Sequence, residues 1–175
     1  MPSAVVEALL EVAPVFDKFS QRERAELLEA TTEETYAAGL EIVSHGEQAR
    51  EMFVLAEGTV EVIESRGPDD ETVLATLIPP GAFGEVAFFE RSKHIVTVRT
   101  LTPVRVLSID REGLDRLIDR QSLVAYKLAH NVLMKLGYQM RRVEEWVSEE
   151  SRDADTITQP RWAAFRAKLY QEWEI

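Results

Sequence analysis

The chain has 175 residues, enough for one domain of ordinary size with an appended helix and too few for two domains with separate cores. Hydrophobic residues make up 45% and charged residues 29%, which is typical of a folded globular protein. Acidic residues outnumber basic ones 31 to 20, so the net charge of −11 disfavours nonspecific binding to nucleic acids and anionic membranes. The absence of cysteine excludes disulfides, thiolate metal sites and cysteine nucleophiles.

The first residues, 1–10, lack the basic start and apolar run of a signal peptide. No segment approaches the roughly 20 apolar residues that span a bilayer. We therefore expect a cytoplasmic protein without a membrane partner.

Residues 1–32 are predicted to form N-terminal helices. Val5, Leu9 and Val12 recur at a helical spacing, and Ser20 with Glu23 fits a capping box that starts a second helix. Residues 33–110 then change to short runs rich in β-branched and aromatic residues, separated by Gly and Pro. The clearest predicted strands are 52–55, 60–63, 73–78, 95–100 and 104–109. Their number and spacing favour an antiparallel barrel or sandwich.

Residues 111–147 return to a helical pattern. Asp110 is a predicted N-cap, and Leu114, Leu117 and Ile118 supply the apolar side of a short helix. A longer helix follows, with an a/d heptad seam that predicts a two-chain interface, although a helix lying along its own domain would also explain it. The seam consists of Tyr126, Ala129, Leu133, Leu136, Met140, Val143 and Val147.

The remaining residues form a predicted linker and a tail. Residues 148–160 are polar, acidic and aperiodic, and residues 161–175 are typical of an amphipathic helix with an aromatic stripe. The stripe consists of Trp162, Phe165, Leu169 and Trp173. Because a lone helix of about 15 residues is marginal in water, the stripe should dock on its own domain, on a dimer mate or on a different protein.

The segment Pro80-Gly81-Ala82-Phe83-Gly84-Glu85-Val86-Ala87 carries the clearest functional signal. Gly84 permits close approach of the backbone, and a helical turn that opens at Glu85 would point free N–H groups toward an anion. The Glu85 carboxylate could accept a hydrogen bond from a sugar hydroxyl.

At this point the chain resembles the cyclic-nucleotide-binding domain family, the sensor domain of catabolite-activator regulators, cyclic-nucleotide-dependent kinases and gated channels. The resemblance covers about residues 12–147. Besides the segment 80–87, which is similar to the family's phosphate-binding cassette, it rests on Phe16, on Gly39 to Val43, on His45-Gly46 and on 52–55 with Gly58. It implies a mainly β, jelly-roll-like barrel with flanking helices and a long C-terminal helix, with its cassette at 80–98.

The resemblance also implies individual roles. The cassette glutamate, Glu85, would hold the ribose 2′-hydroxyl, and the amides around it would hold the cyclic phosphate. The long helix would read the base, with Tyr138 and Gln139 as the nearest polar candidates. The implied ligand-binding residues are Phe83, Gly84, Glu85, Val86, Ala87, His94, Ile95 and Gln139.

The sequence departs from the family at the phosphate clamp. An ungapped match from Glu85 puts His94 where the family has arginine and Ile95 where it has a small residue. Arginine offers a permanent bidentate charge, whereas histidine near pH 7 is largely neutral. His94 could face the pocket or be a surface residue, and Arg91 or Lys93 could replace the arginine or remain solvated.

These observations predict a stand-alone regulatory module, with cyclic AMP or cyclic GMP as a regulatory ligand and no other cofactor. No catalytic constellation stands out and His45 and His130 lack partners at metal-ligand spacing, so we expect neither an enzyme nor a metal site. The acidic tail favours protein contacts over DNA, and the seam favours a homodimer. The alternative is a degenerate domain that binds no nucleotide and acts as a dimerisation or scaffold module.

Overall fold

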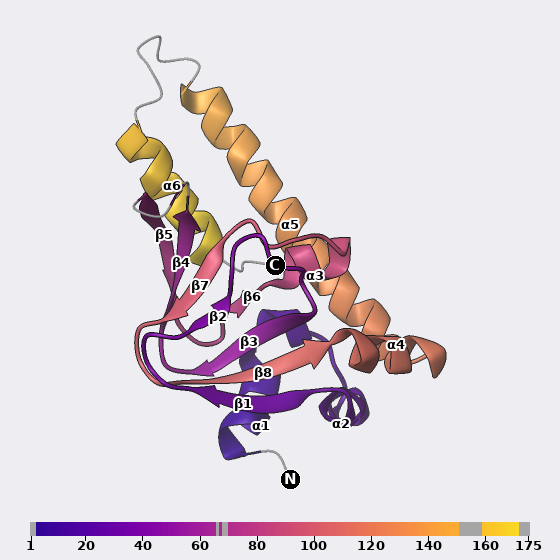
Figure 1. Ribbon diagram of the computed structural model, residues 1–175. Coiled ribbons are helices and arrows are strands. Elements are labelled where there is room, and N and C mark those ends of the chain that lie inside the picture. Colours follow the sequence, from indigo (N-terminus) through magenta and orange to yellow (C-terminus); the bar gives the residue numbers. More distant parts are fainter. Residues whose placement is uncertain (1–2, 66, 68–69, 151–158, 172–175) are drawn as a thin grey trace.

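Two four-stranded antiparallel sheets form the centre of the molecule in the computed structural model, which describes residues 3–65, 67, 70–150 and 159–171 (Figure 1). One sheet has the strand order β1-β8-β3-β6 and the other β2-β7-β4-β5. The predicted β-barrel with flanking helices is confirmed. The strands are β1 (Thr32–Tyr36), β2 (Glu41–Val43), β3 (Glu51–Glu57), β4 (Val60–Ser65), β5 (Glu71–Leu77), β6 (Ala82–Phe83), β7 (Thr97–Thr100) and β8 (Val104–Asp110).

Strand β3 joins two hydrophobic cores, because successive side chains of a strand point to opposite faces. Met52 and Val54 pack among the helices, whereas Phe53 and Leu55 pack in the interior between the two sheets. All four side chains are buried. The barrel thereby holds the helices directly against the strand that also lines its interior.

The N-terminal helices are α1 (Ala4–Val12), the 3-10 turn η1 (Pro14–Phe16) and α2 (Gln21–Glu29). The predicted capping box is confirmed, since the Glu23 amide donates to Ser20 Oγ and the Ser20 amide donates to the Glu23 carboxylate at 2.7 Å. The predicted face of α1 is wrong by one position. Val6, Leu9 and Leu10 are buried, while Val12 is largely exposed.

The C-terminal helices are α4 (Arg111–Asp119), α5 (Leu123–Glu150) and α6 (Gln159–Gln171). The Gly113 amide donates to the Asp110 carboxylate at 2.6 Å, which confirms the N-cap. Helix α5 continues into the predicted linker as far as Glu150, and α6 begins at Gln159, before the predicted position 161. The segment 151–158 and Trp173 lie outside the described residues. Over the described ranges, no helix has an apolar stretch long enough to cross a membrane.

Polar side chains tie the first half of α5 to the N-terminal segment. Asn131 Nδ2 donates to the carbonyl oxygens of Val15 and Asp17 at 3.0 and 3.1 Å. Lys127 Nζ donates to the Glu23 carboxylate at 2.7 Å, and this hydrogen bond is the main reason that the pKa of Glu23 falls to about 2. The start of α5 is therefore held by hydrogen bonds as well as by apolar packing.

Candidate ligand-binding cavity

Gly84 sets the geometry of the cassette. Strand β6 ends at Phe83, and α3 (Glu85–Glu90) begins directly after Gly84, whose φ of 76° lies in the left-handed region that favours glycine. A Cβ atom at this position would lie 3.4 Å from the Glu51 carbonyl oxygen and 3.5 Å from His94 Cε1. The tight turn therefore presents the first amides of α3 and the side chain of Glu85 to one side of the barrel.

A cavity of about 320 Å³ lies beside this turn, enclosed by the cassette, the barrel, α5 and α6. The structure brings the eight residues implied as ligand-binding to its lining, together with Trp162 and Leu169 of the tail, but Tyr138, the other candidate for reading the base, does not line it. The predicted residues on the lining are Phe83, Gly84, Glu85, Val86, Ala87, His94, Ile95 and Gln139. The cavity is thus built from the cassette, the barrel and two C-terminal helices.

Glu85 forms a buried ion pair with Lys135 of α5, a residue that the sequence analysis missed. Lys135 Nζ donates to Glu85 Oε1 at 2.6 Å, and the two side chains are only 4% and 7% exposed. A buried charge needs such a partner, because removing it from water costs several kcal/mol. The sequence does contain a signal for it: Lys135 lies seven residues, or two helical turns, after the apolar Leu128, so a helix places the two side chains on the same face. In this structure the carboxylate that the resemblance assigns to the ribose connects the cassette to the long helix.

His94 is buried in the lining, 8% exposed, so the alternative of a surface histidine is wrong. Its backbone amide donates to the Glu47 carbonyl oxygen at 2.9 Å. Burial lowers the pKa of His94 below its usual 6.5, and the negative charge of Glu47 opposes this shift only in part. The imidazole is therefore neutral near pH 7.

The other two candidate cations, Arg91 and Lys93, and the neighbouring Ile95 are exposed at or beyond the edge of the cavity. Lys93 is exposed but borders the cavity, whereas Arg91 is exposed and lies outside the lining. Ile95 is largely exposed at the mouth, and Val86 is half exposed. Ile95 precedes β7, which begins at Thr97 and not at the predicted position 95.

Helix α6 also lines the cavity. Trp162, Arg166, Leu169 and Tyr170 contribute to the lining. Gln139 Nε2 donates to the Leu169 carbonyl oxygen at 2.5 Å, so the side chain expected to read a base instead holds α6. Arg166 pairs with Glu64 of β4 at 3.4 Å, and burial raises the pKa of Tyr170. The aromatic tail therefore lies against the barrel and α5 of its own chain.

The predicted seam occupies a different face of α5. Tyr126, Leu133 and Met140 are each about two-thirds exposed, and Val147 is 45% exposed. Ala129 and Val143 are half-buried, while Leu136 packs against the helical core. Most of the seam is thus an exposed apolar stripe on this chain. Ile118 of α4, predicted to face the core, is exposed as well.

The family is identified by comparison with known proteins. Residues 33–121, just over half of the chain, match the family model of the cyclic nucleotide-binding domain. The chain belongs to the cyclic nucleotide-binding domain family. No group of acidic or histidine side chains in the described part could hold a metal ion. The family is a regulatory and not a catalytic one.

Individual relatives agree with this assignment. A cAMP-dependent protein kinase regulatory subunit from Debaryomyces hansenii is 31% identical over 112 residues, which cover 64% of this chain and 24% of that protein. The chain thus spans about a quarter of the length of this relative. A cyclic nucleotide-binding domain from Methylobacillus flagellatus has a TM-score of 0.71 at 14% identity, with 87% of this chain and 86% of that one covered. The catabolite activator protein of Thermus thermophilus has a TM-score of 0.68 at 22% identity, over 79% and 63% of the two chains.

Proposed function

We propose that this domain is a stand-alone regulatory module that binds a cyclic nucleotide, cyclic AMP or cyclic GMP, in the cavity between the cassette and α6. The observation that carries the proposal is the shared lining, in which the cassette glutamate, the α3 amides and His94 face one space of about 320 Å³. The apolar side chains of Phe83, Leu169 and Trp162 suit a base.

Recognition of the phosphate would need a further positive charge, because two cations of the lining, Lys135 and Arg166, are already paired with Glu85 and Glu64, and Lys93 lies exposed at the edge of the cavity. The amides at the start of α3 provide neutral donors, and the imidazole of His94, which lies beside Gly84, could become protonated. A bound phosphate would raise the pKa of His94, because the anion stabilises the protonated ring. Nucleotide binding should therefore be accompanied by uptake of a proton.

The output of the module would be a protein contact made by α5 and α6, since both helices line the cavity. The net charge of −11 favours proteins over DNA as targets. The exposed stripe of Tyr126, Leu133 and Met140 supports a homodimer through α5. The proposed role is non-catalytic and cytoplasmic.

A second candidate function is a scaffold module that binds no nucleotide. It is favoured by the ion pair between Glu85 and Lys135, which occupies the carboxylate expected to hold ribose. The replacement of the family's arginine by a buried neutral histidine points in the same direction. In this case the cavity would serve only as the surface on which α6 packs.

Calorimetric titration with cyclic AMP and cyclic GMP at pH 6 and pH 8 distinguishes the nucleotide-binding module from the scaffold module. A simple Glu85→Ala control would leave Lys135 buried without its partner, so the matched control is Glu85→Gln combined with Lys135→Met, which removes both charges. Saturable heat that the control loses supports the sensor. Absence of heat at both pH values, with a folded protein, rules it out and leaves the scaffold.

The pH dependence tests His94 itself. Because burial lowers the pKa of His94 in the free domain and a bound phosphate would raise it, affinity should rise as the pH falls from 8 to 6. Replacing His94→Arg together with Ile95→Ser should remove this dependence and raise affinity by about tenfold to a hundredfold. Equal affinity at both pH values in the unmodified domain would exclude a role for His94 in binding the phosphate.

A further inference from the structure

Apolar side chains form much of the wall of the ligand cavity. Phe83 stacks on Phe53 with ring centroids 5.3 Å apart and an interplanar angle of 18°, so its ring is fixed in the wall. The volume of about 320 Å³ is at the low end of the range for small-molecule sites. These features suit a small ligand with a flat apolar part. The buried apolar side chains that β2, β4 and β7 contribute to the lining are Val43, Val62 and Val98.

The enclosed cations of the lining already face carboxylates. Lys135 Nζ lies 2.6 Å from Glu85 Oε1, and the Arg166 guanidinium lies 3.4 Å from Glu64 Oε1. Lys93 is exposed at the edge, where an ion pair in water contributes little to binding. Within the described part of the chain, an anion that enters the cavity therefore gives up its hydration without meeting an enclosed cation that lacks a counter-charge.

His94 does not supply the missing charge at pH 8. Burial lowers its pKa below 6.5, so at pH 8 fewer than about one in thirty of the rings are protonated. A neutral imidazole offers one N–H group but no charge. The titratable groups that share the cavity with His94 are Glu85, Glu90, Lys93, Lys135, Arg166 and Tyr170. Those that share with it a second hollow are Glu47, Arg50 and Glu51.

The ion pair leaves Glu85 able to hold a sugar hydroxyl. Lys135 donates to Oε1, whereas a carboxylate has about four acceptor positions on its two oxygens. A hydroxyl group donates a hydrogen bond without bringing a net charge, so it adds to the ion pair and does not compete with it. The arrangement thus suits the recognition of a sugar better than the recognition of a phosphate.

We infer that the cavity accepts an uncharged ribonucleoside, and that at pH 8 it binds adenosine or guanosine at least as tightly as the corresponding cyclic nucleotide. The base would lie against the apolar wall and the ribose against Glu85, and no phosphate would have to be desolvated. The inference rests on the proposed function for the place of the ligand, but not for binding of the phosphate. As the pH falls to 6, protonation of His94 improves binding of the cyclic nucleotide alone.

Calorimetric titration of the full chain with adenosine, guanosine, cyclic AMP and cyclic GMP at pH 8 and pH 6 tests the inference. At pH 8 the nucleoside should have a Kd no higher than that of its cyclic nucleotide. Between pH 8 and pH 6 the Kd of the nucleoside should change by less than about twofold, whereas that of the cyclic nucleotide should fall by about tenfold. The probe 2′-deoxyadenosine should bind about tenfold more weakly than adenosine, because the partner of Glu85 is then missing.

Two variants test the charge and the location. His94→Arg with Ile95→Ser supplies the missing cation, so it should raise the affinity for cyclic AMP relative to adenosine at pH 8 by about tenfold to a hundredfold. The matched control is His45→Arg, at an exposed position outside the lining, which should leave this ratio unchanged. Glu85→Gln with Lys135→Met should abolish binding of adenosine. Circular dichroism checks that each variant remains folded.

The outcomes distinguish this inference from the proposed function. If the cyclic nucleotide binds more tightly than the nucleoside at pH 8, the inference is wrong and the proposed function stands. If a nucleoside binds and neither cyclic nucleotide binds at either pH, the proposed function fails and the inference stands. Absence of binding by all four compounds overturns both. Adenosine binding that survives in the Glu85→Gln, Lys135→Met variant, or an equal change of the ratio in His45→Arg, would also overturn the inference.

Discussion

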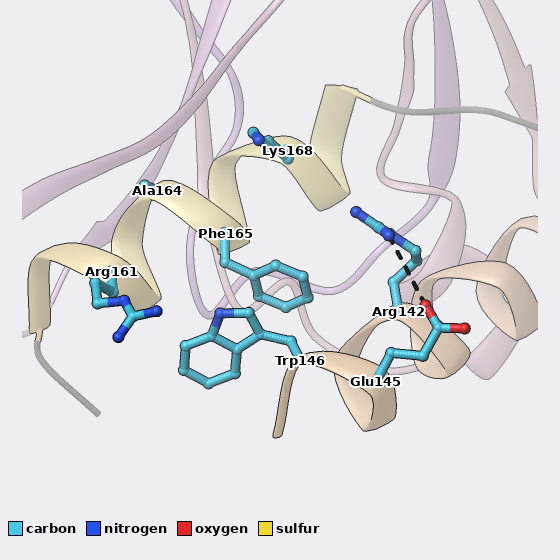
Figure 2. A pocket seen from close by; sticks show the side chains of 7 residues that line it. All are labelled: Arg142, Glu145, Trp146, Arg161, Ala164, Phe165 and Lys168. Atoms are coloured by element: carbon cyan, nitrogen blue, oxygen red, sulfur yellow. Dashed lines mark ion pairs between the residues drawn. The ribbon is translucent and has the colours of Figure 1, made fainter. Parts of the chain in front are cut away.

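The two halves of α5 differ in what holds them. In the first half, Leu123 to Leu136, the side chains of Val124, Leu128 and Val132 are buried in the helical core, and Lys135 is buried against the cassette. In the second half none of the described side chains from Gly137 to Ser148 is buried. There the helix contacts α6 through Gln139, which donates to the Leu169 carbonyl oxygen, and through Trp146, whose ring stacks on Phe165 (Figure 2). The first half thus belongs to the core of the domain, while the position of the second half depends on α6.

The largest effect is expected from Lys135, which belongs to both the core and the cavity. Lys135→Ala leaves the Glu85 carboxylate buried without its partner and should lower the free energy of unfolding by about 3–5 kcal/mol. Urea denaturation measures the loss. Combining Lys135→Met with Glu85→Gln should recover most of it, since no charge then remains buried. A single variant as stable as the parent would contradict the ion pair.

A slightly smaller loss is expected in the apolar part of the first half. Leu128 is fully buried, so Leu128→Ala should cost about 2–5 kcal/mol. Leu133→Ala makes the same chemical change on the exposed face and should cost about 0.5 kcal/mol or less in the monomer. Thermal unfolding at low protein concentration compares the two. Similar losses would mean that the exposed face of α5 is covered.

Removing the aromatic contact tests the second half. Trp146→Ala should remove a stacking energy of about 0.5–1.5 kcal/mol and free α6, with little change in the unfolding of the barrel. Hydrogen exchange is the direct measurement, since amides of α6 should exchange faster while those of β3 and β8 keep their protection. Arg141→Ala, on the exposed side of the same turn, serves as the control. A uniform loss of protection across the barrel would show that the barrel and α6 unfold together, which would contradict the prediction.

The smallest effect is expected at Gly137, where the two halves meet. A Cβ atom there meets no neighbour within 4 Å, and the residue is exposed in the middle of the helix. Gly137→Ala should therefore raise stability by about 0.5–1 kcal/mol through helix propensity alone. A shift of the urea denaturation midpoint measures this gain in stability. Destabilisation would show that the glycine serves a bend or a contact with another chain.

Local signals predicted the fold well where one residue decides the geometry. The capping box at Ser20 and the N-cap at Asp110 are such cases, because the side chain bonds to an amide three residues away. Strands β1, β2 and β6 were not predicted. Strand β1 is a run of Thr, Glu and Tyr without a clear apolar face, and β2 and β6 are too short to show a period. Pairing with longer strands, which the sequence does not display, makes them strands.

The site was predicted only in part because its missing members come from long-range contacts. The cassette is contiguous, so its residues could be chosen from the sequence together. Lys135 and Leu169 reach the cavity from helices whose orientation depends on packing. The first half of α5 also carries apolar residues on two faces, and periodicity selected the exposed one, with Tyr126 and Leu133, over the buried one. No local pattern distinguishes a face that meets its own barrel from a face that meets solvent.

The hydrogen bonds from Asn131 to the Val15 and Asp17 carbonyls give the domain a built-in reporter position. Because Lys18 follows this bonded turn and its side chain is exposed, a dye attached there would sense a displacement of α5 from outside the cavity. The chain contains no cysteine, so Lys18→Cys would provide a unique thiol for labelling. Under the proposed function, one conjugation step would thereby give an optical report of nucleotide binding that leaves the cavity unmodified.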